Sequence, residues 1–186
     1  MTSSTDRGRL RRAWVAAHDP VAGVPRWARI AALAVPLTVL PASLWRIPAA
    51  FDEGIGIGER LYVVCLSIVS ELVAFTAVGL IARWGEVFPR WTPFVRGRRV
   101  PPKAVAIAAA FGALILTVMW TAAWISIFRG VTLRGGATPA NFPTEEGGWK
   151  AATFYVYYLP LLLWGPLLAA VTFAYVQRRR PAIVQA

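Results

Sequence analysis

Residues 104–128 read AVAIAAAFGALILTVMWTAAWISIF, and this run decides the fold because it contains no charged side chain and no proline. At about 1.5 Å of rise per residue, a helix of this length crosses the roughly 30 Å hydrocarbon core of a bilayer. Three further apolar runs occupy residues 30–45, 61–82 and 151–176. The sequence therefore predicts an all-α fold, a four-helix transmembrane bundle formed by residues 30–176.

The segments that flank these runs alternate in basic content. Fifteen arginines and lysines lie in 1–29, 83–103 and 177–186, and five lie in 46–60 and 129–150. Basic segments stay on the cytoplasmic side of a membrane. We therefore expect a multi-pass protein of the bacterial cell membrane with both termini cytoplasmic: an arginine-rich interfacial arm at 1–29 and a tail at 177–186.

The net charge of +11 could suggest a nucleic-acid partner, but the placement of the charges argues against one. Topology and attraction to anionic lipid headgroups at the inner loop, 83–103, explain the charge better. The first apolar run is short, so we also consider a signal peptide cleaved near Pro48-Ala49-Ala50, although we expect the run to be retained.

The chain has one cysteine, Cys65, inside the second run, and one histidine, His18, in the N-terminal arm. This excludes a disulfide within the chain, a thiolate or histidine metal centre, and a histidine-dependent triad within the membrane. We expect no metal and no cofactor.

Glu71 is the only charged residue inside any of the four runs, ten residues into the second. An ionised carboxylate there is costly to desolvate, so we expect it to be protonated, paired or in contact with a wet cavity. No basic residue lies at a matching depth, which favours a neutral acid able to donate a proton. The alternative is a structural hydrogen bond to Ser67, Thr117 or Thr121.

Aromatic residues gather toward the predicted outer side. Trp120 and Trp124 share one helix face at a spacing of four residues, and Tyr157 and Tyr158 lie in the outer half of the fourth run. They fit either an interfacial aromatic belt or the wall of a cavity that stabilises a cation. Arg46, at the outer end of the first run, is either an interfacial anchor or an anion-facing residue.

Five blocks of sequence carry a family resemblance. They are LPASLWR (40–46), SIVSE (67–71), RWGEVFPRW (83–91), GRRVP (97–101) and YLPLLLWGP (158–166). Over about residues 35–180 the chain resembles small four-helix integral membrane proteins of actinobacteria, most of them uncharacterised. More loosely, it is similar to small membrane-bound terpene cyclases of actinobacterial natural-product pathways.

The cyclase resemblance implies protonation of an alkene or epoxide on a lipophilic isoprenoid substrate, followed by cyclisation and proton loss. Glu71 would be the acid, and Trp120, Trp124, Tyr157 and Tyr158 would face the cation. Asp52 or Glu53 would relay protons near the mouth of the site. The paired acidic motifs of magnesium-dependent synthases are missing from the sequence.

A second function class remains open. The chain could be a non-catalytic small transporter or an accessory subunit of a membrane complex, in which Glu71 binds a proton or a partner helix. Four helices are few for a monomeric transporter, so this alternative predicts an oligomer. An enzyme instead predicts a closed cavity within one protomer.

Overall fold

The computed structural model describes residues 23–51, 54–85, 100–140 and 142–184. Within these ranges the chain is helical, with one isolated bridge between Val131 and Ala137 and no β-strand. Four helical segments are long and apolar enough to cross a membrane: Arg26–Pro48, Ile57–Gly79, Pro102–Phe128 and Gly148–Arg180. The predicted all-α four-helix architecture is confirmed, and the protein is a multi-pass membrane protein by the length and composition of its helices.

The helices do not coincide with the apolar runs: all four begin earlier, and the second ends at Gly79, three residues before its run does. They are α2 (Arg26–Ala49), α3 (Ile57–Gly79), α4 (Pro102–Phe128), and the successive α6 (Gly148–Tyr158), η2 (Leu159–Leu163) and α7 (Trp164–Val184). The single turns η1 (Arg83–Gly85) and α5 (Pro143–Glu146) lie in connections. Each long helix begins two to four residues before its apolar run, because helical geometry continues past the hydrocarbon into polar residues such as Arg26 and Glu59.

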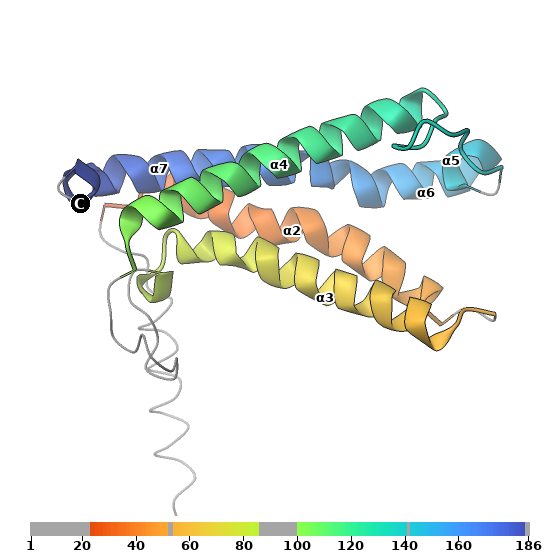
Figure 1. The fold of residues 1–186 in the computed structure, drawn as a ribbon, viewed down its shortest axis with the longest axis horizontal. Helices are drawn as coiled ribbons and strands as arrows, with labels where there is room; N and C mark the ends of the chain where they lie inside the picture. Colours follow the sequence, from red (N-terminus) through yellow and green to blue (C-terminus); the bar gives the residue numbers. More distant parts are fainter. Residues whose placement is uncertain (1–22, 52–53, 86–99, 141, 185–186) are drawn as a thin grey trace, which may run out of the picture.

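The fourth span changes helix type at Pro160. Proline removes a backbone donor and clashes with the carbonyl four residues earlier, and the chain there forms the 3₁₀ segment η2 before α7 resumes at Trp164. By contrast, α2 remains one α-helix through Pro36, Pro41 and Pro48. The fourth span therefore divides into two halves that meet near the middle of the bundle (Figure 1).

Helix α2 is central to the packing. It packs along α3 on one side and along α7 on the other, and α7 packs along α4, so the order across the bundle is α3–α2–α7–α4. In the view of Figure 1 the α2–α3 pair and the α4–α6–α7 group lie close together near the C-terminus and separate toward the opposite end. We call the end that carries Arg26, Lys103 and Arg178 the basic end, and the opposite end the far end.

Small residues pack inside and large ones face outward. Helix α2 buries Ala28, Ala32 and Ala42 completely, whereas Leu33 and Leu37 are more than half exposed. Close approach of helix backbones through small residues is the usual packing mode in membranes, where lipid solvates the large apolar side chains. The outer faces of the bundle are accordingly apolar, as expected for contact with hydrocarbon.

Two close contacts fix the helices at their crossings. Gly165, the second residue of α7, lies against α4 so tightly that an added Cβ would be 2.6 Å from the backbone nitrogen of Thr117 and 2.8 Å from the carbonyl oxygen of Ala113. At the basic end, Nη2 of Arg178 donates a hydrogen bond of 3.1 Å to the carbonyl oxygen of Leu80, just after α3. This bond satisfies one carbonyl that the end of a helix leaves without a partner.

Candidate functional site

Glu71 lies on the inward-facing stripe of α3. Ser67, Ala74 and Val78 follow the same helical face at spacings of four, three and four residues around it, and all three are buried. Glu71 itself is half-buried, but its Oε2 atom is out of contact with solvent and makes no hydrogen bond to the described residues. The acid therefore belongs to the interior of the bundle and not to its lipid-facing surface.

The position of Glu71 along α3 is counted from the start of the helix or from the start of the apolar run. Because α3 begins at Ile57, Glu71 lies fourteen residues into the helix, or about 21 Å from its far end and about 12 Å from Gly79. The apolar run alone, which starts at residue 61, had placed the acid about 15 Å from the far end. The four residues that α3 adds before this run include Glu59 and Arg60, so Glu71 still lies near the middle of the apolar run.

Two of the three expected hydrogen-bond partners of Glu71, Ser67 and Thr117, donate their hydroxyl protons elsewhere. The hydroxyl of Ser67 donates to the carbonyl oxygen of Val63 at 2.9 Å, and that of Thr117 donates to the carbonyl oxygen of Ala113 at 2.7 Å. Both bonds stay within the donor's own helix, a common choice for hydroxyls in apolar surroundings. Neither hydroxyl is therefore free to donate to the carboxylate, which weakens the purely structural explanation of Glu71.

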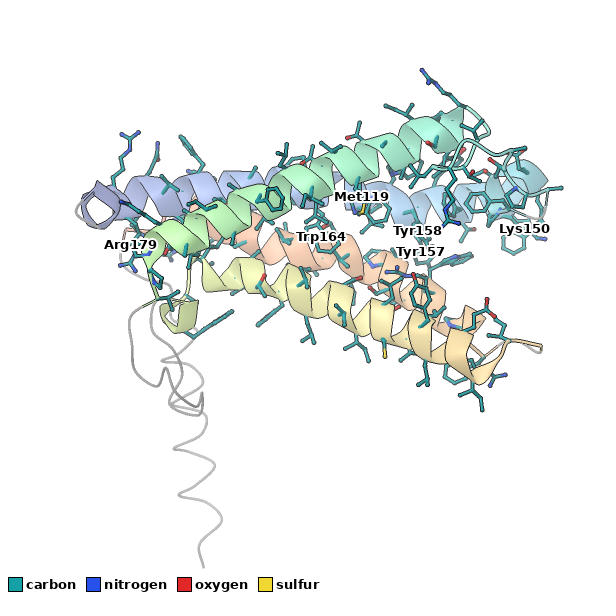
Figure 2. The ribbon with its side chains drawn as sticks, viewed as in Figure 1. Met119, Lys150, Tyr157, Tyr158, Trp164 and Arg179 are labelled. Carbon is teal, nitrogen blue, oxygen red and sulfur yellow. The ribbon has the colours of Figure 1, made fainter. Side chains whose placement is uncertain are left out.

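Part of the predicted aromatic wall reaches the same interior. Trp120 and Tyr158 pack against a buried cluster that includes Ala74, one turn from Glu71, and Trp164. Nε1 of Trp120 is buried without a hydrogen bond to the described residues. Figure 2 shows Trp164, Tyr157 and Tyr158 on the side of their segment that faces α2. Two of the four predicted aromatic residues, Trp120 and Tyr158, thus pack against the same buried cluster as Ala74.

The other two predicted aromatic residues belong to the far end. Trp124 contacts the rings of Phe128, Phe154 and Tyr155 at centroid distances of 5.7, 6.2 and 5.7 Å. Tyr157 stacks on Trp45 across the bundle, with centroids 5.0 Å apart and planes inclined by 29°. These contacts make a ring-to-ring cluster that holds α6 against α4 and α2 near the membrane boundary.

Sequence reasoning missed two buried aromatic residues of these clusters, Phe154 and Trp164. Phe154 lies at the centre of the far-end cluster, stacked on Tyr158 at 4.5 Å, and is 6% exposed. Trp164, equally buried, is the aromatic residue that joins the cluster around Ala74. Both occupy apolar surroundings in sequence, and nothing in the sequence distinguishes Phe154. For Trp164 the signal is its position after Pro160, because the change of helix type reorients the residues that follow it.

Arg46 lies at the far end of α2. Arg46 stands in the last turn of this helix, where positive charge suits the helix dipole, and its Nε donates a 3.1 Å hydrogen bond to the carbonyl oxygen of Ala42, one turn earlier. It is also close enough to Tyr158 to interact with it electrostatically. These contacts are typical of an interfacial anchor. Asp52 and Glu53, the predicted proton relay, lie outside the described residues.

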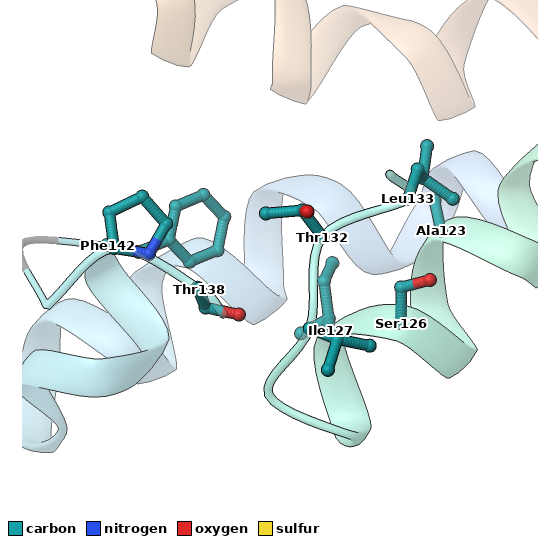
Figure 3. Close-up of a pocket in the computed structure, with 9 residues that line it drawn as sticks. Ala123, Ser126, Ile127, Thr132, Leu133, Thr138 and Phe142 are labelled. Carbon is teal, nitrogen blue, oxygen red and sulfur yellow. The ribbon is translucent and has the colours of Figure 1, made fainter. Parts of the chain in front are cut away.

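The described residues form several hollows, of which three of at least 210 Å³ lie away from Glu71. One of about 210 Å³ lies at the far end between α4 and the loop that follows it, lined by residues that include Ala123, Thr132 and Phe142 (Figure 3). Two apolar grooves run along the outside of α4, one beside α7 and one beside α3. None of the three is lined by Glu71 or by the four predicted aromatic residues.

The described residues contain no group of three or more histidine, cysteine or acidic side chains placed to hold a metal ion. No family model, curated protein or solved structure matches the chain. The resemblance to actinobacterial membrane proteins and terpene cyclases therefore stays a prediction. What the fold defines is the class: an integral membrane protein with four spanning helices.

Proposed function

We propose that this protein is a metal-independent intramembrane enzyme that uses Glu71 as a general acid on a lipophilic, isoprenoid substrate. The observation that supports it best is the buried Oε2 atom of Glu71, which lacks a hydrogen bond within the described part of the chain. Leaving such an atom unpaired costs about 1–3 kcal/mol, and buried ionisable groups inside membranes generally serve function.

The aromatic surroundings suit the chemistry of a carbocation. The faces of Trp120, Trp164 and Tyr158 carry negative electrostatic potential that stabilises a positive charge nearby. Protonated Glu71 would give its proton to one carbon of a terminal alkene, and the π electrons would form the new C–H bond. A second alkene would then attack the cation, and the carboxylate would accept a proton from a neighbouring carbon to leave a cyclic isomer.

Glu71→Gln tests this directly, because glutamine keeps the size and polarity of the side chain but cannot supply a proton. We expect turnover of prenylated substrates in membranes to fall by at least about 100-fold, the usual loss for a general acid, while membrane insertion is unchanged. The readout is mass spectrometry for a product of unchanged mass and altered retention.

Glu59→Gln is the matched control, since Glu59 is an exposed glutamate in the first turn of the same helix. Its product yield should equal that of wild type. Full activity of Glu71→Gln would remove Glu71 as the acid, whereas a wild-type chain inactive on a broad substrate panel would favour the second candidate.

The second candidate is an accessory subunit or small transporter that works as an oligomer. The exposure of α4 favours this candidate, because only 6% of its apolar span is buried within the protomer, compared with 39% of the span of α2. A partner helix on α4 would give a fixed oligomer mass in mild detergent, and this mass would change when Phe111, exposed on α4, is replaced by a charged residue. For both candidates we propose the bacterial cell membrane with both termini cytoplasmic.

A further inference from the structure

Helix α3 lies at one edge of the bundle. It packs along α2 and makes only slight contact with α7. Only 22% of its apolar span is buried, compared with 39% of the span of α2. Most of the circumference of α3 is therefore turned toward the hydrocarbon of the bilayer.

Glu71 stands where the buried face of α3 meets this lipid-facing surface. One turn away on one side are Ser67 and Ala74, which are 3% and 0% exposed. One turn away on the other side are Ile68 and Phe75, which are 55% and 41% exposed. Residues three and four apart are neighbours on the surface of a helix, so these four side chains surround the acid. Because Glu71 is half-buried, its buried Oε2 atom lies on the inner side of this boundary and the exposed part of its side chain lies on the outer side.

The outer side of Glu71 borders hydrocarbon. Glu71 lies near the middle of the apolar run of residues 61–82, and none of the three hollows described above is lined by it. The hydroxyls of the nearby Ser67 and Ser70 donate to carbonyl oxygens of α3 itself, at 2.9 and 2.6 Å. Such surroundings favour the neutral acid, whose proton is then available to a molecule dissolved in the lipid.

We propose that molecules reach Glu71 laterally from the hydrocarbon of the bilayer, across the edge of α3 that Ile68 and Phe75 border. This route admits a lipid-soluble molecule that carries no charge near the group that meets the carboxyl. An isoprenoid alkene satisfies this requirement. The identity of the substrate therefore rests on the proposed function, whereas the route rests on the placement of Glu71 alone.

Two carbodiimides of different solubility test the route, because their reaction with a protonated carboxyl group does not require that the protein be an enzyme. The carboxyl oxygen bonds to the central carbon of the reagent, the proton moves to a reagent nitrogen, and rearrangement to the N-acylurea makes the adduct stable without a leaving group. In native membranes we expect dicyclohexylcarbodiimide, which dissolves in lipid, to label Glu71. A cationic, water-soluble carbodiimide should label the exposed Glu59 and leave Glu71 unmodified. Tandem mass spectrometry of the peptides locates each adduct.

A pair of tryptophan variants tests where the reagent approaches. Ile68→Trp places an indole ring beside Glu71 on the outer side of α3, and should slow labelling by dicyclohexylcarbodiimide several-fold. Ile107→Trp is the matched control, since Ile107 is 69% exposed on the outer face of α4, and its Glu71 should be labelled at the wild-type rate.

Four results would overturn the lateral route. Labelling of Glu71 by the water-soluble reagent as fast as Glu59 would mean that the carboxyl faces a water-filled cavity. Resistance of Glu71 to both reagents, or an unchanged labelling rate in Ile68→Trp, would mean that nothing approaches it across this edge. A wild-type dimer that Glu71→Leu dissociates would identify a second copy of the chain as the cover of the edge. Labelling of Glu71 in a chain without turnover would instead support the route and count against the proposed enzyme.

Discussion

Gly165→Ala should force α7 and α4 apart at their close crossing. The new Cβ would be 2.6 Å from the backbone nitrogen of Thr117 and 2.8 Å from the carbonyl oxygen of Ala113. Ordinary contacts to a Cβ are about 3.4–4 Å, so α7 and α4 must move apart by several tenths of an ångström or more. Neither obstructing atom can rotate away, because both belong to the α4 backbone.

The expected loss of stability is about 1–3 kcal/mol, the usual cost of overpacking a rigid contact. Part of it is offset because alanine is a better helix former than glycine by up to about 1 kcal/mol. Thermal unfolding of the purified protein in detergent, followed by near-ultraviolet circular dichroism of its tryptophans, gives the midpoint to compare with wild type.

Gly112→Ala provides the control within the same helix pair. Its Cβ would meet only Leu168 Cδ2 at 4.0 Å, an ordinary contact, so we expect unchanged or slightly raised stability. Adding Thr117→Ala to Gly165→Ala removes the nearby hydroxyl but not the backbone atoms, and should restore only part of the loss. If Gly165→Ala and Gly112→Ala unfold at the same temperature, the close crossing of α4 and α7 is wrong.

Two further outcomes follow from the topology and the far-end rings. For the topology, single cysteines are introduced in a Cys65→Ser background. Ala137→Cys at the far end should react with a membrane-impermeant maleimide on intact cells, whereas Gln177→Cys at the basic end should react only after lysis. The opposite labelling would reverse the proposed orientation. A double-mutant cycle of Trp45→Ala and Tyr157→Ala, measured by thermal unfolding, should give a coupling of about 0.5–1.5 kcal/mol for the stacked pair. Additive effects of the two substitutions would mean that the rings do not hold α2 to α6.

The sequence predicted the number and approximate limits of the spans because length and apolar content alone determine them. It could not tell which face of each helix turns inward. In a membrane both the interior of the bundle and its lipid-facing surface are apolar, so the spacing of hydrophobic residues does not identify the buried face of a helix. In α2 the distinction lies in size instead: alanines such as Ala28 and Ala32 are buried, and Leu33 and Leu37 face outward.

The candidate site was predicted only in part for the same reason. The sequence alone identifies Glu71, because it is the only charged residue within the apolar runs. Which aromatic residues approach it depends on the crossing at Gly165 and on the 3₁₀ turn at Pro160, which are long-range features. Thus Trp120 and Tyr158 pack against the cluster that contains Ala74 and Trp164, whereas Trp124 and Tyr157 make ring contacts at the far end.

The stability of a leucine variant distinguishes a catalytic Glu71 from a structural one. If the carboxyl group bonds across the bundle, Glu71→Leu removes that bond and should destabilise the protein by about 1 kcal/mol, as interhelical hydrogen bonds in membranes do. If Oε2 is unpaired, as in the described part of the chain, leucine removes a desolvated polar atom and should leave the midpoint of unfolding unchanged or raise it. A raised midpoint of unfolding together with lost turnover would mean that Glu71 lowers the stability of the wild-type fold. That is the behaviour of a functional group and not of a packing residue.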